Sequence, residues 1–501
     1  MTGGLMKTAS QGAIAAALAG LLLSSGSALA ADLGGNCCAD LEERIAELEA
    51  TTVRKGNRRV SLTLSGHVNR SLMYWNDGFR DDVYSVDNAI ANSRFRLSGS
   101  AKLGADVTIG FLTEFSMAFG ARSHQVSQID DDGFSVIGGI VGGLGFGDGI
   151  GGAGDSVLDF NQANWYVSSN HWGRLTVGRL ASATAGIAVI DLSNTGIVAN
   201  SQPFLWGGGM LLRNGEGSLA ALTWGQMCGG PGSAVTAAFF GNAGPYSTDC
   251  GIHALTRRDA VMYTSPTWHG FTVSGAFGED DFWDVAGRYA GEWYGFRVAA
   301  GIGYRWYEDR EPDRIVLGPP DARLDDTHRR HWLTSASLMH TATGLFVSGA
   351  WTQYQYEGSN PHEIFDLDPG RNRPDTTLWY VNGGIQKNWL GVGATTFYGE
   401  YGRVEDGITG LVAAPLGTGA LLSSGLGPLG AEGVVFDSEM TWWGVGVVQK
   451  IDAAAMDLYL AYRQYSATII MGDSAVAGDA VQIRGGLEDI WYIQAGARIQ
   501  F

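Results

Sequence analysis

The sequence predicts an all-β protein, a closed antiparallel barrel of sixteen strands that crosses a membrane, and three observations support this fold class. Apolar and polar side chains alternate over segments such as Val60–Asn69 and Met456–Arg463, and about ten residues suffice for a tilted membrane strand. Short connections alternate with long ones along the chain, as turns and outer loops do in such a barrel. The last segment, Trp491–Phe501, also alternates and ends in an aromatic residue.

The composition fits a large β protein. The 501 residues include 75 Gly but only 12 Pro, with 11% aromatic and 17% charged residues. Disordered or collagen-like chains do not carry that aromatic content. The net charge of −18 argues against a nucleic-acid partner, because a phosphate backbone needs a basic surface.

Residues 1–30 are expected to be a cleaved signal peptide. Lys7 supplies the positive end, Ala13–Leu23 is a short apolar run, and Ala28–Ala30 is an A-x-A cleavage site. No later stretch offers the roughly eighteen uninterrupted apolar residues of a spanning helix. An exported chain of this kind is periplasmic, secreted, or a barrel in the outer membrane of a Gram-negative bacterium.

Residues 31–59 are predicted to form an N-terminal periplasmic segment with a short helix. Within Asp40–Thr52 the chain is charged, and Leu41, Ile45 and Leu48 fall at heptad spacing. So short a helix is marginal alone, and assembly around a symmetry axis would stabilise it. The alternative is a linker helix that faces solvent.

Residues 60–501 are assigned to the barrel, with a long excursion at 181–256. If Ser218–Trp224 and Ala234–Phe240 cross the membrane, the strand count is eighteen. If both belong to the excursion, the count is sixteen, which is the prediction.

The strand count bears on the cysteines. With sixteen strands, Cys228 and Cys250 lie on one side of the membrane and can form a disulfide in the oxidising envelope; eighteen strands would separate them. Cys37 and Cys38 are adjacent and too close to pair comfortably with each other. The four cysteines lack zinc-site spacing, and no metal or cofactor is predicted.

Strand parity predicts which charged side chains face a wet interior, because an Arg or Lys facing lipid costs about 2–4 kcal/mol at mid-bilayer. The predicted inward set is Arg94, Arg96, Lys102, Arg174, Arg288, Arg297, Arg305, Arg463, Arg498, Glu114, Asp284 and Asp457. For each of them the alternative is simple solvation without tuning the pore. Aromatic residues near strand ends are expected at the membrane interfaces; they are Trp75, Trp165, Tyr166, Trp268, Trp293, Tyr294, Trp306, Trp389 and Trp491.

Several strings resemble the porins of alphaproteobacteria, the family found in rhizobia and brucellae. They are CCADLEERIAELEA at 37–50, KGNRRVSLTLSG at 55–66, RDAVMYTSP at 258–266, GEDDFWD at 278–284, DAAAMDLY at 452–459 and ARIQF at 497–501. The resemblance covers the mature chain. It implies a homotrimeric outer-membrane porin, a water-filled passive diffusion channel for ions and small hydrophilic solutes, with a long loop folded inward as a constriction.

The segment from Arg174 to Arg179 resembles the strand that precedes this constriction loop. Simple parity puts these two arginines on opposite faces, so a bulge or the strand end must redirect Arg179. We expect a basic wall to face an acidic loop and to create a transverse field in the pore. The expected constriction residues are Arg94, Arg96, Arg174 and Arg179 on the wall and Asp191 and Asn194 on the loop.

The terminal Phe501 looks like the signal read by the barrel-assembly machinery. Further expected contacts are outer-membrane lipid and lipopolysaccharide, and peptidoglycan through the N-terminal helix. Two alternative functions remain, a substrate-selective channel and a structural protein tethered to the cell wall. No G-x-S-x-G or Walker motif is present, so no enzymatic activity is predicted.

Overall fold

The chain divides into two units, 1–57 and 58–501, and all described residues belong to the second. The expected signal peptide and the expected helix at Asp40–Thr52 lie outside the described residues. The computed structural model describes residues 60–117, 122–124, 126–128, 158–228, 257–278, 281–309, 327–357, 374–409, 412–413, 433–472, 480–482 and 486–501.

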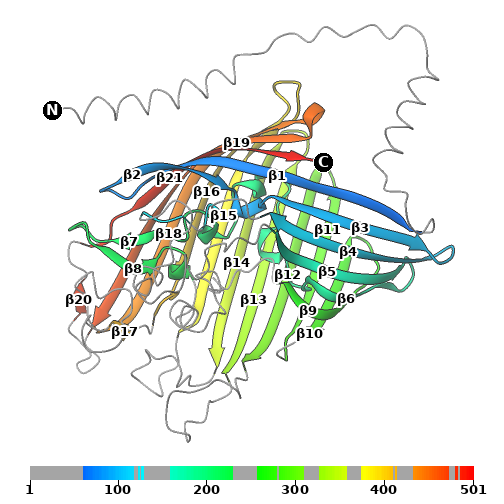
Figure 1. The fold of residues 1–501 in the computed structure, drawn as a ribbon, viewed down its shortest axis with the longest axis horizontal. Helices are drawn as coiled ribbons and strands as arrows, with labels where there is room; N and C mark the ends of the chain where they lie inside the picture. The colour runs from blue at the N-terminus through cyan, green and yellow to red at the C-terminus, as the bar shows by residue number, and fades with distance from the viewer. Residues whose placement is uncertain are drawn as a thin grey trace, which may run out of the picture. The chain divides into compact units, whose positions relative to one another are not determined.

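The second unit is a closed antiparallel barrel of sixteen strands (Figure 1), which confirms the predicted fold class and strand count. Each wall strand pairs with the next, and β21 pairs with β1 to close the ring. The wall strands are β1 (Ser61–Asn76), β3 (Arg94–Lys102), β4 (Val107–Met117), β5 (Leu158–Ser169), β6 (Gly173–Ala181), β9 (Arg257–Thr264), β10 (Phe271–Gly278), β11 (Trp283–Trp293), β12 (Phe296–Asp309), β13 (Thr327–His340), β14 (Leu345–Glu357), β15 (Thr376–Lys387), β16 (Thr395–Glu405), β18 (Gly433–Ile451), β19 (Met456–Gly472) and β21 (Ile490–Gln500).

Two strands, β2 (Asp81–Asp87) and β3, occupy the place beside β1 in the ring. β2 pairs with the later half of β1, and β3 pairs with its first half. A single 3₁₀ turn, η1 (Ala89–Ala91), joins β2 to β3. The two strands therefore share one place beside β1.

Four further short strands are not among the sixteen wall strands. β17 (Val412–Ala413) pairs with β18, and β20 (Ala480–Gln482) pairs with β19. β7 (Leu211–Arg213) and β8 (Leu219–Thr223) pair only with each other. The predicted alternative of a membrane strand at 218–224 is thus excluded, while 234–240 lies outside the described residues.

The connections at one end of the barrel are short, as the sequence predicts. The turn between β13 and β14 shows why glycine recurs there. Gly344 has a φ of +75°, and an added Cβ would collide with the carbonyl oxygen of Gln386. Only glycine combines this left-handed backbone with so close an approach.

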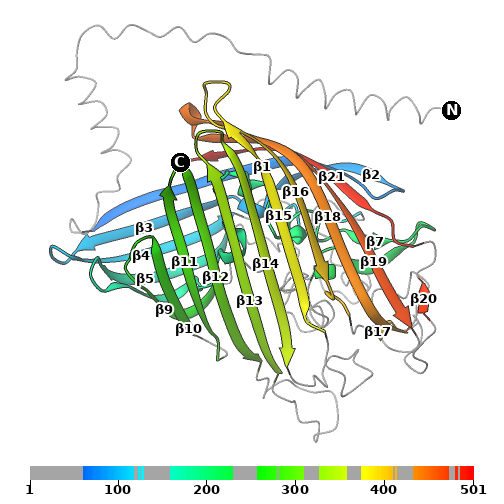
Figure 2. The same ribbon diagram turned by 180° about the vertical axis from the view of Figure 1, so that it is seen from behind.

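The two faces of the wall differ as a membrane barrel requires. On β13, His331, Leu333 and Ser335 point inward and are buried, whereas Trp332 is 39% exposed on the outer face. Figure 2 shows β11 to β16 as one continuous tilted wall. No helix among the described residues is long and apolar enough to cross a membrane.

Aromatic rings form a belt on the outer face. The ring centroids of Tyr304 and Trp332 are 4.6 Å apart, and those of Trp379 and Tyr401 are 5.2 Å apart. Such rings suit the membrane–water interface. The prediction was wrong for Trp75, which is buried on the inward face of β1, and for Tyr166, whose ring lies under the Arg174 guanidinium.

Candidate functional site

Residues 182–228 follow β6 and fold into the barrel. At their start, the backbone amides of Ala183 and Thr184 donate to the Asp284 carboxylate of β11 at 3.1 and 2.7 Å. Farther along, the Asn382 amide of β15 donates to Thr195 Oγ1 at 2.9 Å. These partners are inward-facing residues of the wall, so this inserted segment runs through the interior.

The inserted segment then continues round to the first strands. The Asn194 side chain donates to Asp457 of β19 at 3.2 Å. The Asn88 side chain, between β2 and η1, donates to the Ile197 carbonyl oxygen at 2.9 Å. The segment therefore covers the inner faces from β11 to β2.

A buried ion pair fixes the wall under this segment. The Arg463 guanidinium bonds both Glu400 oxygens at 2.7 and 2.9 Å, and their side chains are 0% and 1% exposed. Tyr380 donates to Glu400 at 2.8 Å, and Trp206 lies over the guanidinium at 4.7 Å. A buried charge pair is tolerated because its hydrogen bonds are satisfied.

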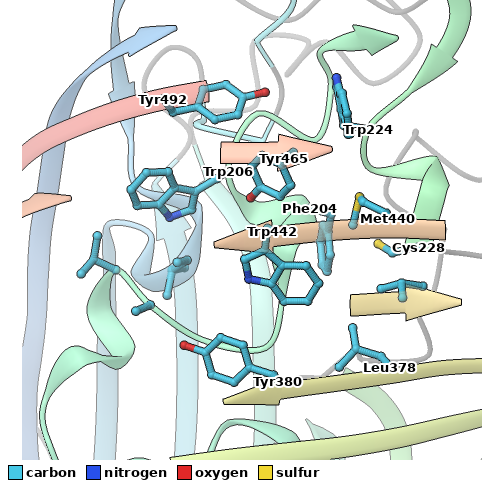
Figure 3. Close-up of a cluster of buried hydrophobic side chains, with 14 of the residues drawn as sticks. Phe204, Trp206, Trp224, Cys228, Leu378, Tyr380, Met440, Trp442, Tyr465 and Tyr492 are labelled. Carbon is cyan, nitrogen blue, oxygen red and sulfur yellow. The ribbon is translucent and has the colours of Figure 1, made fainter. Parts of the chain in front are cut away.

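Apolar side chains of the segment pack against the same part of the wall. Figure 3 shows Trp206, Tyr465, Trp442 and Tyr380 directed toward one another. All members of this aromatic cluster are 6% exposed or less. The segment contributes Phe204, Trp206, Trp224 and Cys228, and the wall contributes Leu378, Tyr380, Met440, Trp442, Tyr465 and Tyr492.

The opposite wall is basic. Arg94 and Arg257 approach Glu114 at 3.5 and 3.4 Å, and Arg96 also bonds this carboxylate. Glu114 is fully buried, whereas the Arg96 side chain is 46% exposed. Three cations around one anion leave an excess of positive charge on the inner faces of β3, β4 and β9.

The other predicted wall arginines have different surroundings. The Arg174 guanidinium lies 3.6 Å from the centre of the Tyr166 ring, and its Nε donates to Thr176 at 3.3 Å. Arg179 lies opposite Asp259 in the register of β6 and β9, with 4.0 Å between the charged groups. The charged partner of Arg179 is therefore a carboxylate of the wall strand β9.

The predicted loop residues make structural contacts. The Asp191 carboxylate accepts hydrogen bonds from the backbone amides of Ser193 at 2.7 Å and Gly196 at 2.9 Å. Within the described ranges, no ion pair joins Asp191 to an arginine. The opposition of Asp191 and Asn194 to the arginine wall stays a prediction.

Two further predicted sites can be located. Cys228 is buried and disulfide-bonded; Cys250 lies outside the described residues, so their pairing stays a prediction. The backbone of Phe501 exchanges two hydrogen bonds with Gly66 of β1, at 2.8 and 3.0 Å. The terminal residue thus helps to close the ring.

Sequence reasoning did not identify Glu400, Tyr380, Trp442 or Trp206 as anchors of the inserted segment. Alternation marks the first three as inward-facing, but nothing in the sequence shows which part of the segment meets them. Among the described residues, no group of three or more His, Cys, Asp or Glu side chains could hold a metal ion.

The barrel is closed, carries an aromatic belt on its outer face, and contains charged side chains and an inserted segment in its interior. This architecture defines a membrane channel. The chain belongs to the Gram-negative porin family, whose sequence profile matches residues 13–469. It is an outer-membrane porin that forms a water-filled passive diffusion channel for ions and small hydrophilic solutes.

Solved porin structures are similar to this chain at low identity. The anion-selective porin of Comamonas acidovorans is 16% identical with a TM-score of 0.49, over 88% of this chain and 100% of that one. The outer-membrane protein OmpT of Vibrio cholerae is 12% identical with a TM-score of 0.44, over 89% and 99%. OmpF of Salmonella typhi, in complex with daunomycin, is 11% identical with a TM-score of 0.43, over 88% and 98%. No curated protein matches the chain in sequence.

Proposed function

We propose that this porin is a general diffusion channel whose interior favours anions and that it works as a homotrimer without enzymatic activity. The observation that carries the ion preference is the cluster of Arg94, Arg96 and Arg257 around the single carboxylate of Glu114. Charged walls of low dielectric focus the field in a narrow aqueous passage and raise the local concentration of counter-ions.

Reversal potentials in a tenfold KCl gradient test this preference. Changing Arg96→Gln, or Arg94→Ser together with Arg96→Ser, should move selectivity toward cations, because positive charge leaves the wall. Asp191→Asn should move it toward anions if that carboxylate contributes to the field. These shifts should shrink at high salt, since the Debye length falls to about 3 Å at 1 M.

Arg403→Ser is a matched control. Arg403 follows the exposed Tyr401 on the outer face of β16 and bonds Glu439 at 2.9 Å. Its loss should leave the reversal potential unchanged. If the Arg94 and Arg96 variants behave like this control, the selectivity filter does not include the arginine cluster.

The homotrimer is supported by one charged residue on the outer wall. Arg70 lies between the exposed Val68 and Leu72 on the same face of β1, and its guanidinium bonds Ser85 of β2 at 3.2 Å. It lies opposite Ala497 of β21. An arginine on a lipid-facing wall costs about 2–4 kcal/mol at mid-bilayer, so a charged side chain at this place favours a protein neighbour over lipid.

The similarity to alphaproteobacterial porins belongs to the same proposal and is supported by the strings at 37–50, 55–66 and 258–266. A tether to peptidoglycan through Asp40–Thr52 is a further part of it. Pull-down of purified peptidoglycan by the full-length chain, but not by a chain lacking residues 39–52, would support that tether.

A further inference from the structure

We infer that the pore contains a second anion-binding site, separate from the Glu114 cluster, in which Arg174 presents its guanidinium to the lumen and takes a small oxyanion such as inorganic phosphate. Arg174 is the second residue of β6 and directly follows a short connection, so the site lies toward the short-turn end of the barrel. This inference rests on the proposed diffusion function and deepens its preference for anions.

The register of the wall strands separates Arg174 from the Glu114 cluster. Arg174 pairs with Ser168 of β5, and Ser168 pairs with Thr108 of β4. Thr108 and Glu114 lie six residues apart on that strand, at positions 108 and 114. At a rise of about 3.3 Å per residue, the two rows are about 20 Å apart along the strand. An ion bound at Arg174 is therefore held by its own set of neighbours.

An aromatic ring holds the Arg174 guanidinium in place. The central carbon of the guanidinium lies 3.6 Å from the centre of the Tyr166 ring. Tyr166 in turn lies over Gly110 of β4, where an added Cβ would come 2.5 Å from the tyrosine hydroxyl. Glycine at this position therefore leaves room for the ring. Stacking on an aromatic face orients the planar guanidinium and leaves the N–H groups at its edge free to donate.

Arg174 has no counter-ion within the part of the chain that the structure describes. Its Nε donates to Thr176 Oγ1 at 3.3 Å, and no carboxylate forms an ion pair with it. The residue is half-buried, so it has lost part of its hydration. Such a cation attracts an anion from the lumen. In the Glu114 cluster, by contrast, all three arginines already approach a carboxylate.

Hydroxyl groups flank Arg174 on both sides. Ser168 of β5 and Thr264 of β9 lie directly opposite it in the register of three neighbouring strands (Figure 1), and both are half-buried. Side chains opposite each other in an antiparallel pair have Cβ atoms about 4.5–5.5 Å apart. Two hydroxyls and the fork of guanidinium N–H groups match the several acceptor oxygens of phosphate, whereas chloride offers no paired oxygens.

No acidic residue interrupts the row of inward-facing side chains around Arg174. From β3 to β10 the residues in register are Lys102, Thr108, Ser168, Arg174, Thr264 and Ser274. The row combines two cations with hydroxyl groups. Its field therefore favours an anion along its whole length.

Block of chloride current by phosphate tests the site. Wild-type channels in planar bilayers conduct KCl while inorganic phosphate is added at constant ionic strength. A bound phosphate should reduce the current in a saturable way. Arg174→Gln should raise the half-blocking phosphate concentration on the order of tenfold, because hydrogen bonds to a charged group contribute about this factor.

Two further variants distinguish a built site from simple charge. Arg174→Lys keeps the charge but removes the planar fork, and should also lose most of the block. Arg297→Gln is the matched control, since Arg297 is half exposed and already lies 3.9 Å from the Glu292 carboxylate. Its loss should leave the half-blocking concentration unchanged. If Arg174→Gln does not insert, Tyr166→Leu, which removes the ring under the guanidinium, is measured in its place.

The same measurements separate this site from the diffusion function. A wild type that folds but does not conduct would overturn the diffusion function itself. A conducting wild type that phosphate does not block, or a block that survives Arg174→Gln, would overturn the phosphate site alone. Equal weakening of the block by Arg174→Gln and Arg96→Gln would also overturn it, because the effect would then belong to the general field of the wall.

Discussion

Gly207 shows how one residue positions the inserted segment. Its φ is +60°, its amide donates to the Ser123 carbonyl oxygen at 2.7 Å, and an added Cβ would overlap the Tyr492 side chain. The left-handed backbone and the contact both require glycine. Tyr492, on β21, is itself fully buried.

Gly207→Ala should therefore destabilise the folded barrel. The left-handed conformation costs alanine about 1–2 kcal/mol, and overpacking against Tyr492 adds about 1–3 kcal/mol. Gly186→Ala is the matched control, because Gly186 has a φ of +80° with nothing within 4 Å of the added Cβ. Denaturant unfolding should give a lower free energy of unfolding for Gly207→Ala than for Gly186→Ala. Equal values would show that the Tyr492 side chain moves aside without cost.

The ion pair of Arg463 and Glu400 is a second case at this scale. Glu400→Gln leaves the Arg463 charge buried without its counter-ion, which should cost about 3–5 kcal/mol of unfolding free energy. Glu439→Gln removes a carboxylate from Arg403 in a pair that is 35% and 37% exposed, and should cost about 1 kcal/mol or less. Similar losses of unfolding free energy for the two variants would contradict the burial of the Arg463–Glu400 pair.

At the scale of elements, closure of the ring depends on β1 and β21. They pair in antiparallel register from His67 opposite Gln500 to Asn76 opposite Trp491. Gly66 lies beyond this register, where an added Cβ would come 2.7 Å from the Phe501 ring. The Phe501 ring therefore packs against Gly66 of β1, where a larger residue would collide with it.

Deleting Phe501, or changing it to Asp, should reduce assembly into the outer membrane far more than it alters conductance. The deletion removes a terminal aromatic residue and two backbone hydrogen bonds to Gly66. Phe501→Tyr keeps both features and should assemble normally. Surface levels measured by labelling of intact cells provide the readout, and normal levels for the deletion would contradict a signalling role.

At the scale of the whole molecule, the outer face offers a place for subunit contact around Arg70. Native mass measurement of detergent-purified protein should show a trimer. Deleting residues 39–52 should leave a barrel that inserts but loses part of its oligomer heat resistance, since the predicted heptad helix then contributes nothing. A monomer as the only species would contradict the homotrimer.

The sequence by itself determined the barrel. Alternation in segments such as β1 and β19 decides which side chains face lipid, because strand side chains have a period of two and a one-residue slip would reverse every one of them. Short glycine turns and long connections fixed the order of neighbours. The choice of sixteen strands over eighteen was settled only by the structure, in which β8 pairs with β7 and not with the wall. Parity also identified Arg94, Arg96 and Glu114 as inward-facing before any partner was known.

Only the tertiary structure decided what the interior does. Arg463 and Arg94 look alike in sequence, yet one is sealed under Trp206 with Glu400 and the other shares Glu114 beside an exposed Arg96. Parity is a property of one strand and its neighbours. The path of the inserted segment depends on contacts between residues that lie hundreds of positions apart, such as Pro203 with Tyr465. Such packing depends on the three-dimensional complementarity of many side chains, which no local sequence period encodes.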